Sequence, residues 1–142
     1  MKRYIFLEHM TDALIESYGT NLEEAFDNAA RGLVDTMVDI KTIKENIEEK
    51  FEVSGRDLKN LLYNWLESVL VKVTLNEFVF SSFNVKIQKN IFGGFEIKGV
   101  GLGEKLDLKK HKPKTEAKAV TYHLMRINEK KEQVSVRFLI DL

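Results

Sequence analysis

Cysteine is absent from this 142-residue chain, and proline occurs only once. The absence of cysteine excludes disulfide bonds, thiolate metal ligands and cysteine nucleophiles, and it suits a cytoplasmic protein. No apolar run approaches the roughly 18 residues that a membrane-spanning helix needs, and no signal peptide is expected at the start of the chain. We therefore expect a cytoplasmic protein without a membrane partner. Scarce proline and glycine, together with many Lys and Glu, hint at a thermophile.

An excess of charge of either sign is also lacking, because 22 Lys and Arg balance 22 Asp and Glu. A protein that holds RNA by its phosphates normally shows a basic excess or a basic stripe. The balance argues against autonomous nucleic-acid binding. We expect the protein to meet nucleic acid only indirectly, through a partner protein. With 44% hydrophobic and 31% charged residues, the chain has a globular composition. Its length predicts a single domain over residues 1–142.

Recognisable catalytic motifs are missing as well. Only three histidines occur, His9, His111 and His123, and there is no nucleophile elbow or P-loop. Glycines alternate along residues 99–103, which indicates close packing in a strand rather than phosphate binding. Carboxylates are plentiful, so paired acids remain open, but they carry no specific signal. We expect no catalytic residues and therefore no enzyme.

Two segments predict long amphipathic helices. Thr20 and Glu23 form a capping-box pattern, and apolar residues then recur at helical spacing from Leu22 to Met37. Ser54 and Asp57 form a similar pattern, followed by the same spacing over residues 58–73. Each helix should bury one apolar face against a sheet.

The remaining segments predict strands. Apolar and polar residues alternate over residues 83–88, and a turn at Gly93-Gly94 leads into a second strand. Residues 134–140 should pair with residues 117–127, and shorter strands are expected at residues 4–7, 13–18 and 47–53. Long helices inserted among hairpins predict an α+β sandwich of β-sheets with two long amphipathic helices.

One candidate metal site is the segment that contains Glu8, His9 and Asp12. Two acids and an imidazole within five residues of a loop can converge on a cation, and hard divalent ions prefer oxygen ligands. Zinc would require more nitrogen or sulfur. The alternative is that Asp12 caps a turn and His9 packs beneath it.

The chain end is a second candidate. Asp141 stands beside the terminal carboxylate of Leu142, so two anionic oxygen donors follow an apolar strand. The simpler explanation is that Asp141 keeps the terminus soluble.

A third candidate is the polar loop that begins at Gly103 and ends at Lys118. It carries six lysines and His111, which form the only basic cluster recognised in a neutral chain. Long loops in compact domains tend to be functional or disordered. A loop that merely faces water is the more common explanation.

Five blocks of sequence, taken in order, resemble the archease family. Residues 6–12 (F-L-E-H-M-T-D) resemble the family signature F-L-D-H-T-A-D, and residues 18–26 resemble its Y-G-x-x-L-E-E-A-F continuation. Residues 61–66 are similar to its L-L-x-x-W-L block. Gly103-Glu104, Lys110-His111 and residues 118–123 resemble its G-E, K-H and K-A-[IV]-T-Y-H run, and the chain ends on the family's D-[IL].

The resemblance implies an accessory protein that activates an RtcB-type tRNA-splicing ligase by promoting its guanylylation and repeated turnover. It also implies a divalent metal ion of the calcium type, held by Asp12, Asp141 and Leu142. Residues implied to contact the partner or support the metal ligands are Glu8, His9, Lys110, His111, Lys118 and His123. The chain departs from the signature at Glu8, where Asp is usual, and at Met10 and Thr11, which replace Thr and Ala.

Two other functions stay open from sequence. A metal-dependent hydrolase or nuclease could use Glu8, His9, Asp12 and Asp141, because metal catalysis needs a coordination position open to water. A chaperone-like protein would instead offer an exposed apolar surface to its partners.

Overall fold

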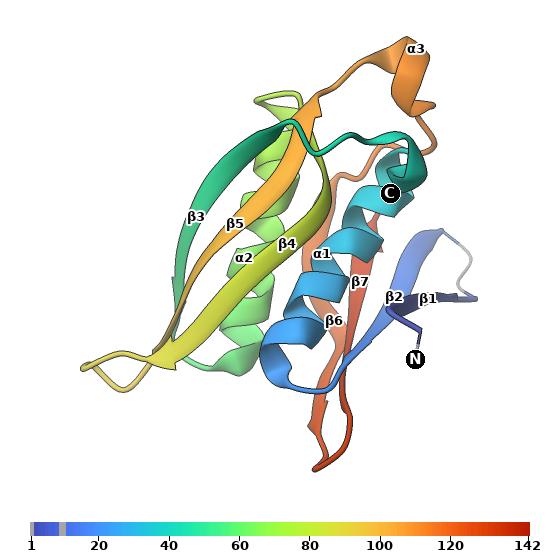
Figure 1. Ribbon diagram of the computed structural model, residues 1–142. Helices are drawn as coiled ribbons and strands as arrows, with labels where there is room; N and C mark the ends of the chain where they lie inside the picture. Colours follow the sequence, from blue (N-terminus) through green and yellow to red (C-terminus); the bar gives the residue numbers. More distant parts are fainter. Residues whose placement is uncertain (1, 9–10) are drawn as a thin grey trace.

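The computed structural model describes residues 2–8 and 11–142. Strands and helices follow one another along the chain as shown in Figure 1. The elements are β1 (Tyr4–Leu7), β2 (Asp12–Gly19), α1 (Leu22–Met37), the short 3-10 helix η1 (Ile40–Thr42), β3 (Ile47–Gly55), α2 (Leu58–Thr74), β4 (Phe78–Lys89), β5 (Phe95–Lys105), α3 (Leu108–His111), β6 (Ala119–Glu129) and β7 (Val134–Asp141). None of the helices in these ranges is long and apolar enough to cross a membrane.

The strands form two antiparallel sheets. The order is β1-β2-β7-β6 in the four-stranded sheet and β3-β5-β4 in the three-stranded sheet. Helix α1 packs on β2 and β7 and also on β4, whereas α2 packs on β3 and on β6, so both long helices contact both sheets (Figure 1). The expected α+β sandwich with two long amphipathic helices is confirmed.

The hydrophobic core lies where the two helices meet the sheets. Trp65 of α2 is fully buried, and its indole N–H donates to the carbonyl oxygen of Phe26 on α1 at 3.0 Å. The Trp65 ring also meets Phe51 and Phe83 edge-on at centroid distances of 5.1 and 5.6 Å. Aromatic rings favour such edge-to-face contacts. The core therefore joins α1, α2 and the three-stranded sheet into one packed unit.

Glycines in β5 let the aromatic core approach the backbone. A Cβ atom at Gly101 would lie 2.8 Å from a ring carbon of Phe80 and 3.1 Å from a ring carbon of Phe51. At Gly103 it would collide with the carbonyl oxygen of Val79. The predicted close packing of these alternating glycines is confirmed.

The start of α1 differs from the predicted Thr20–Glu23 capping box. The capping residue is Asn21, whose side chain accepts the N–H of Glu24 at 2.8 Å. The Glu24 carboxylate in turn accepts the N–H of Thr20 at 3.2 Å. The capping pattern is therefore shifted by one residue, because the Glu23 carboxylate accepts the N–H of Ile87 in β4 instead.

Helix α2 begins at Leu58, as the apolar spacing predicted, but its capping residue lies three positions after Ser54. Ser54 belongs to β3, and Asp57 is the capping residue, accepting the N–H of Asn60 at 2.8 Å. The Asn60 side chain accepts the N–H of Arg56 at 3.0 Å. An asparagine thus takes the place that a Glu or Gln has in a capping box.

Two acids of α1 reach the outer edge of β4. Glu23 accepts the backbone N–H of Ile87 at 2.9 Å, and Asp27 accepts that of Val85 at 3.1 Å. Because β4 is an edge strand, these N–H groups have no neighbouring strand as a partner. The helix side chains therefore complete the hydrogen bonding of the sheet edge.

Candidate functional site

The strand register places Asp12 and Asp141 side by side. Asp12 is the first residue of β2 and Asp141 the last of β7, and the two are directly paired across these antiparallel strands. Directly paired residues point to the same face of a sheet, with Cβ atoms about 5 Å apart. Two acids that are 129 positions apart in sequence therefore lie together at one end of the four-stranded sheet, where β2 begins and β7 ends. We call this end of the sheet, with Asp12, Asp141 and the chain terminus, the acidic edge.

The chain terminus is fixed at the same edge. The side chain of Leu142 packs against the hydrophobic core, and the carbonyl oxygen of Asp141 accepts the N–H of Lys118 at 2.8 Å. Asp141 therefore lies between Asp12 on one side and the start of β6 on the other. The last residue of the chain is therefore held next to the two aspartates and does not form a free tail.

The donors at this edge suit a hard divalent cation. They are carboxylate oxygens, which calcium and magnesium prefer. The described residues contain no group of three or more His, Cys, Asp or Glu side chains placed to hold a metal. A third protein ligand would therefore be the terminal carboxylate of Leu142, which is not a side chain. Glu8 is exposed just beyond β1, while His9 lies outside the described residues.

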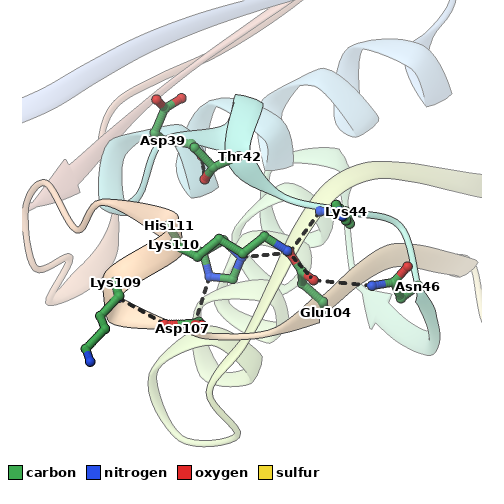
Figure 2. Close-up of polar contacts among 9 residues, drawn as sticks. All are labelled: Asp39, Thr42, Lys44, Asn46, Glu104, Asp107, Lys109, Lys110 and His111. Atoms are coloured by element: carbon green, nitrogen blue, oxygen red, sulfur yellow. Dashed lines mark hydrogen bonds and ion pairs between the residues drawn. The ribbon is translucent and has the colours of Figure 1, made fainter.

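A second polar cluster surrounds Glu104 near the end of β5 (Figure 2). Its carboxylate accepts the N–H of Lys44 at 2.9 Å and forms a 2.7 Å ion pair with the ammonium of Lys110. It also meets Nε2 of His111 at 2.8 Å and the side-chain amide of Asn46 at 3.3 Å. The Lys110 ammonium, followed by the Lys44 N–H, lowers the pKa of Glu104 from 4.5 to about 2.

His111 is held by both ring nitrogens. It is fully buried, and its Nδ1 accepts the N–H of Asp107 at 2.9 Å. A nitrogen that accepts a hydrogen bond carries no proton, so Nε2 carries the proton and donates it to Glu104. The ring therefore fastens α3 to β5, and its buried polar atoms are all engaged.

The segment from Lys112 to Lys118 connects this cluster to the acidic edge. Its middle is tied to the end of α1, because Lys114 donates its N–H to the Met37 carbonyl at 2.8 Å and pairs with Asp35 at 3.0 Å. Its end is tied to Asp141 through Lys118. The segment expected to be a polar loop is therefore the short helix α3, followed by an irregular segment that is hydrogen-bonded to the end of α1 and to β7.

The predicted partner-contacting or supporting residues occupy different places. Lys110 and His111 are engaged with Glu104 on the three-stranded sheet, whereas the exposed side chain of Lys118 directly precedes β6. His123 is exposed in the irregular part of β6, four residues beyond Ala119. At about 3.3 Å per strand residue, His123 lies roughly 13 Å along the strand from the acidic edge. The structure brings Lys118 to that edge and leaves His123 away from it.

Sequence reasoning missed two features of the site region. Lys44 and Asn46, which precede β3, complete the shell of Glu104, and Asp107 caps α3 while holding His111. The order Asp107 followed by a short basic run was a helix-start signal, but the lysines there suggested a solvated loop. No local sequence pattern predicts the contacts of Lys44 and Asn46, because these residues are far from Glu104 in the sequence.

The fold and the acidic strand edge define a class of small α+β proteins with two antiparallel sheets around two helices. The model of the archease protein family matches residues 4–142. A protein archease of Pyrococcus abyssi is 44% identical over 129 residues, covering 91% of this chain and 90% of its own. One from Sulfolobus acidocaldarius is 39% identical over the full length of both chains, and one from Danio rerio is 36% identical over 99% of this chain and 86% of its own. The chain belongs to the archease family.

Solved structures agree with this membership. The solution structure of protein 1598 from Methanobacterium thermoautotrophicum superposes with a TM-score of 0.85 at 31% identity, with full coverage of both chains. A crystal structure from Thermotoga maritima, described as an archease and possible chaperone, gives a TM-score of 0.59 at 17% identity, covering 96% of this chain and 94% of that one. The second likeness concerns the fold alone.

Proposed function

We propose that this archease is an accessory protein that activates an RtcB-type tRNA-splicing ligase by promoting its guanylylation and repeated turnover. Broader nucleotide use by the ligase belongs to the same proposal. The protein itself is not the enzyme, and it meets RNA only through the ligase. Family membership supports the proposal, and the observation that carries it is the pairing of Asp12 with Asp141.

The proposed working surface is the acidic edge formed by Asp12, Asp141 and the terminal carboxylate of Leu142. A divalent ion of the calcium type would be held there by these oxygens and would concentrate positive charge at an exposed edge. The protein's own contribution is to hold the carboxylates in place. The strand register aligns the two aspartates, Leu142 anchors the terminus, and Lys118 holds the backbone of Asp141.

The test combines ion binding with single-turnover guanylylation of the cognate ligase. We expect Asp12→Asn and Asp141→Asn each to weaken calcium binding at least about tenfold, since each removes a charged ligand. Each should reduce stimulation of guanylylation more than it reduces association with the ligase. Glu132→Gln is the matched control, because Glu132 is an exposed acid in the turn at the far end of β7. Wild-type calcium affinity and stimulation in both aspartate variants would contradict the proposal.

The same experiment separates the metal-dependent hydrolase. RNA and phosphoester substrates incubated with this protein alone and calcium or magnesium should stay intact. Cleavage that disappears in Asp12→Asn would assign an enzymatic role to the edge instead.

One observation favours a chaperone-like second function. Ile91 and Phe92, in the turn between β4 and β5, are 92% and 89% exposed. Asn90 holds this turn by accepting the N–H groups of Phe92 and Gly94 at 2.9 and 3.1 Å. Two neighbouring apolar side chains on a fixed turn can contact an apolar surface of another protein. This protein should suppress aggregation of a denatured client, and replacing both residues with Ser should abolish that suppression without changing calcium binding.

A further inference from the structure

Two neighbouring hollows lie beside the first residues of the chain. One, of about 710 Å³, is lined by Lys2, Arg3 and Lys41 together with the apolar side chains of Ile40 and Ile43. The other, of about 380 Å³, is lined by Lys2 and Arg3 again and by Arg31 of α1, together with Glu24, Asp27 and Asn28 of the same helix. We call this shared surface, with its cations Lys2, Arg3, Arg31 and Lys41, the basic hollow.

Like most Lys and Arg side chains of the described residues, the cations of the basic hollow form no ion pair, in contrast to several cations elsewhere. Arg137 pairs with Glu16 at 2.8 Å, Lys72 with Glu49 at 3.0 Å, and Lys114 with Asp35 at 3.0 Å. No ion pair joins Lys2, Arg3, Arg31 or Lys41 to an acid in residues 2–8 and 11–142. In a chain with no net charge, four such cations around one concave surface are a local excess.

Arg31 is the least satisfied of the four. Its Nε atom is buried and has no hydrogen-bond partner in the structure. Burial, and next the charge of Arg3, lower the pKa of the Arg31 guanidinium. A buried donor without an acceptor is uncommon in a folded protein and calls for an explanation, such as a bound ion. Arg3 and Arg31 line the same hollow and repel each other, and an anion bound by both would relieve that repulsion.

The acids near Arg31 are committed to other groups. Asp27 accepts the N–H of Val85, and burial raises its pKa from 3.8 to about 7, so near neutral pH it supplies only part of a negative charge. Glu24 accepts the N–H of Thr20 at the start of α1. Glu45 accepts hydrogen bonds from the hydroxyls of Ser81 and Ser82. Hydrogen bonding does not remove the charge of a carboxylate, but three acids against four cations offset the positive charge of the hollow only in part.

We propose that the basic hollow binds the phosphate group of a small phosphorylated molecule, with Arg3 and Arg31 as the principal contacts. Guanidinium groups match the geometry of phosphate oxygens and bind them through paired, charge-assisted hydrogen bonds. Lys2 and Lys41 add charge at the rim, while Ile40 and Ile43 offer an apolar wall to the rest of the molecule. The site lies on different residues from the acidic edge, so it stands independently of the proposed function.

The test is a nuclear magnetic resonance titration of the full chain at constant ionic strength, with inorganic phosphate and guanosine monophosphate as probes. We expect saturable shifts of the Arg3 and Arg31 Nε–H signals. Arg3→Gln and Lys41→Gln should each weaken binding, the former about tenfold because it removes a charge-assisted contact. Arg126→Gln is the matched control, since Arg126 is an exposed arginine of β6 outside the hollow. It should bind both probes like the wild type.

Arg31→Lys provides a second variant that keeps the charge and removes the forked donor. It should bind phosphate more weakly while unfolding near the wild-type temperature. If it does not fold, Arg3→Gln and Lys41→Gln decide the question, because both residues are near the surface. Shifts that do not saturate, or equal losses in Arg126→Gln, would overturn the proposal. Equal binding of guanosine without phosphate would also overturn it, and preferential binding of a 5′-hydroxyl oligonucleotide would reassign the surface to an RNA backbone.

Discussion

The cluster around Glu104 and the acidic edge at Asp141 use the same functional group in opposite ways. The Glu104 carboxylate has four partners from the protein and lies against the buried ring of His111. The Asp141 carboxylate is exposed, and no hydrogen bond or ion pair of its side chain occurs among the described residues. A carboxylate with all its partners inside the protein stabilises the fold, whereas one that faces solvent beside another acid can take a ligand from outside.

Removing Glu104 should produce the largest effect on stability. Glu104→Ala leaves the buried Nε2–H of His111 without an acceptor, which by itself costs about 1–3 kcal/mol, and it also leaves Lys110 unpaired. We expect the free energy of unfolding to fall by about 2–3 kcal/mol in urea denaturation. Glu52→Ala, at an exposed position of β3, should change it by less than about 0.5 kcal/mol. Equal losses in both variants would show that the Glu104 contacts are not special.

Lowering the pH should remove the contribution of Glu104 to stability, because its carboxylate becomes protonated. Because the pKa of Glu104 is about 2 in the folded protein and 4.5 ordinarily, its contribution is fully present above pH 4.5. That contribution is lost as the pH falls from 4.5 towards 2. Asp27 changes in the opposite sense, since its raised pKa lowers stability as the pH rises from 3.8 to about 7. Urea denaturation across pH should therefore show a flatter acid limb in Glu104→Gln and a flatter limb above pH 4 in Asp27→Asn.

A C-terminal extension should affect the acidic edge alone. Adding residues after Leu142 converts the terminal carboxylate into an amide, which removes one of the three proposed ligand groups. We expect calcium affinity to fall at least about tenfold, with the urea midpoint nearly unchanged. An untagged protein prepared in parallel is the reference. Identical calcium binding in the two forms would remove Leu142 from the site and leave the aspartates as its ligands.

The smallest expected effect is that of Asp141→Asn on stability. The side chain is exposed and keeps its size, so the free energy of unfolding should change by less than about 0.5 kcal/mol. Calcium binding to the same variant is expected to fall, which separates ligand binding from folding. A loss above 1 kcal/mol without calcium would place Asp141 with Glu104 as a structural carboxylate.

Much of the fold was predictable because its signals are local. The helical spacing over residues 22–37 and 58–73 and the turn at Gly93-Gly94 correspond to observed elements. The helix caps were predicted at the wrong residues, since several polar side chains near each start can accept the same N–H groups. Tertiary contacts made the selection: Glu23 bonds to β4, which leaves Glu24 for the cap of α1.

The two polar clusters differ in what sequence could reveal. Residues 8–12 and the chain end were recognised as candidates from their chemistry, but only the family resemblance joined Asp12 to Asp141. Strand register, which pairs them, depends on long-range packing. The basic hollow was not predicted at all, because its cations come from the start of the chain, from α1 and from η1. A neutral overall charge conceals such a local concentration.

The contacts of α1 with β4 also limit how this molecule can associate. A partner that joins a sheet by adding a strand needs the free N–H groups of an edge. On β4 the N–H groups of Val85 and Ile87 are already taken by Asp27 and Glu23, so an incoming strand would have to displace two helix carboxylates. This part of β4 is therefore closed to another strand, and the opposite edge of the three-stranded sheet is β3. Helix α1 thus protects part of the β4 edge against strand pairing with a second copy of the protein, which is a first step towards fibres.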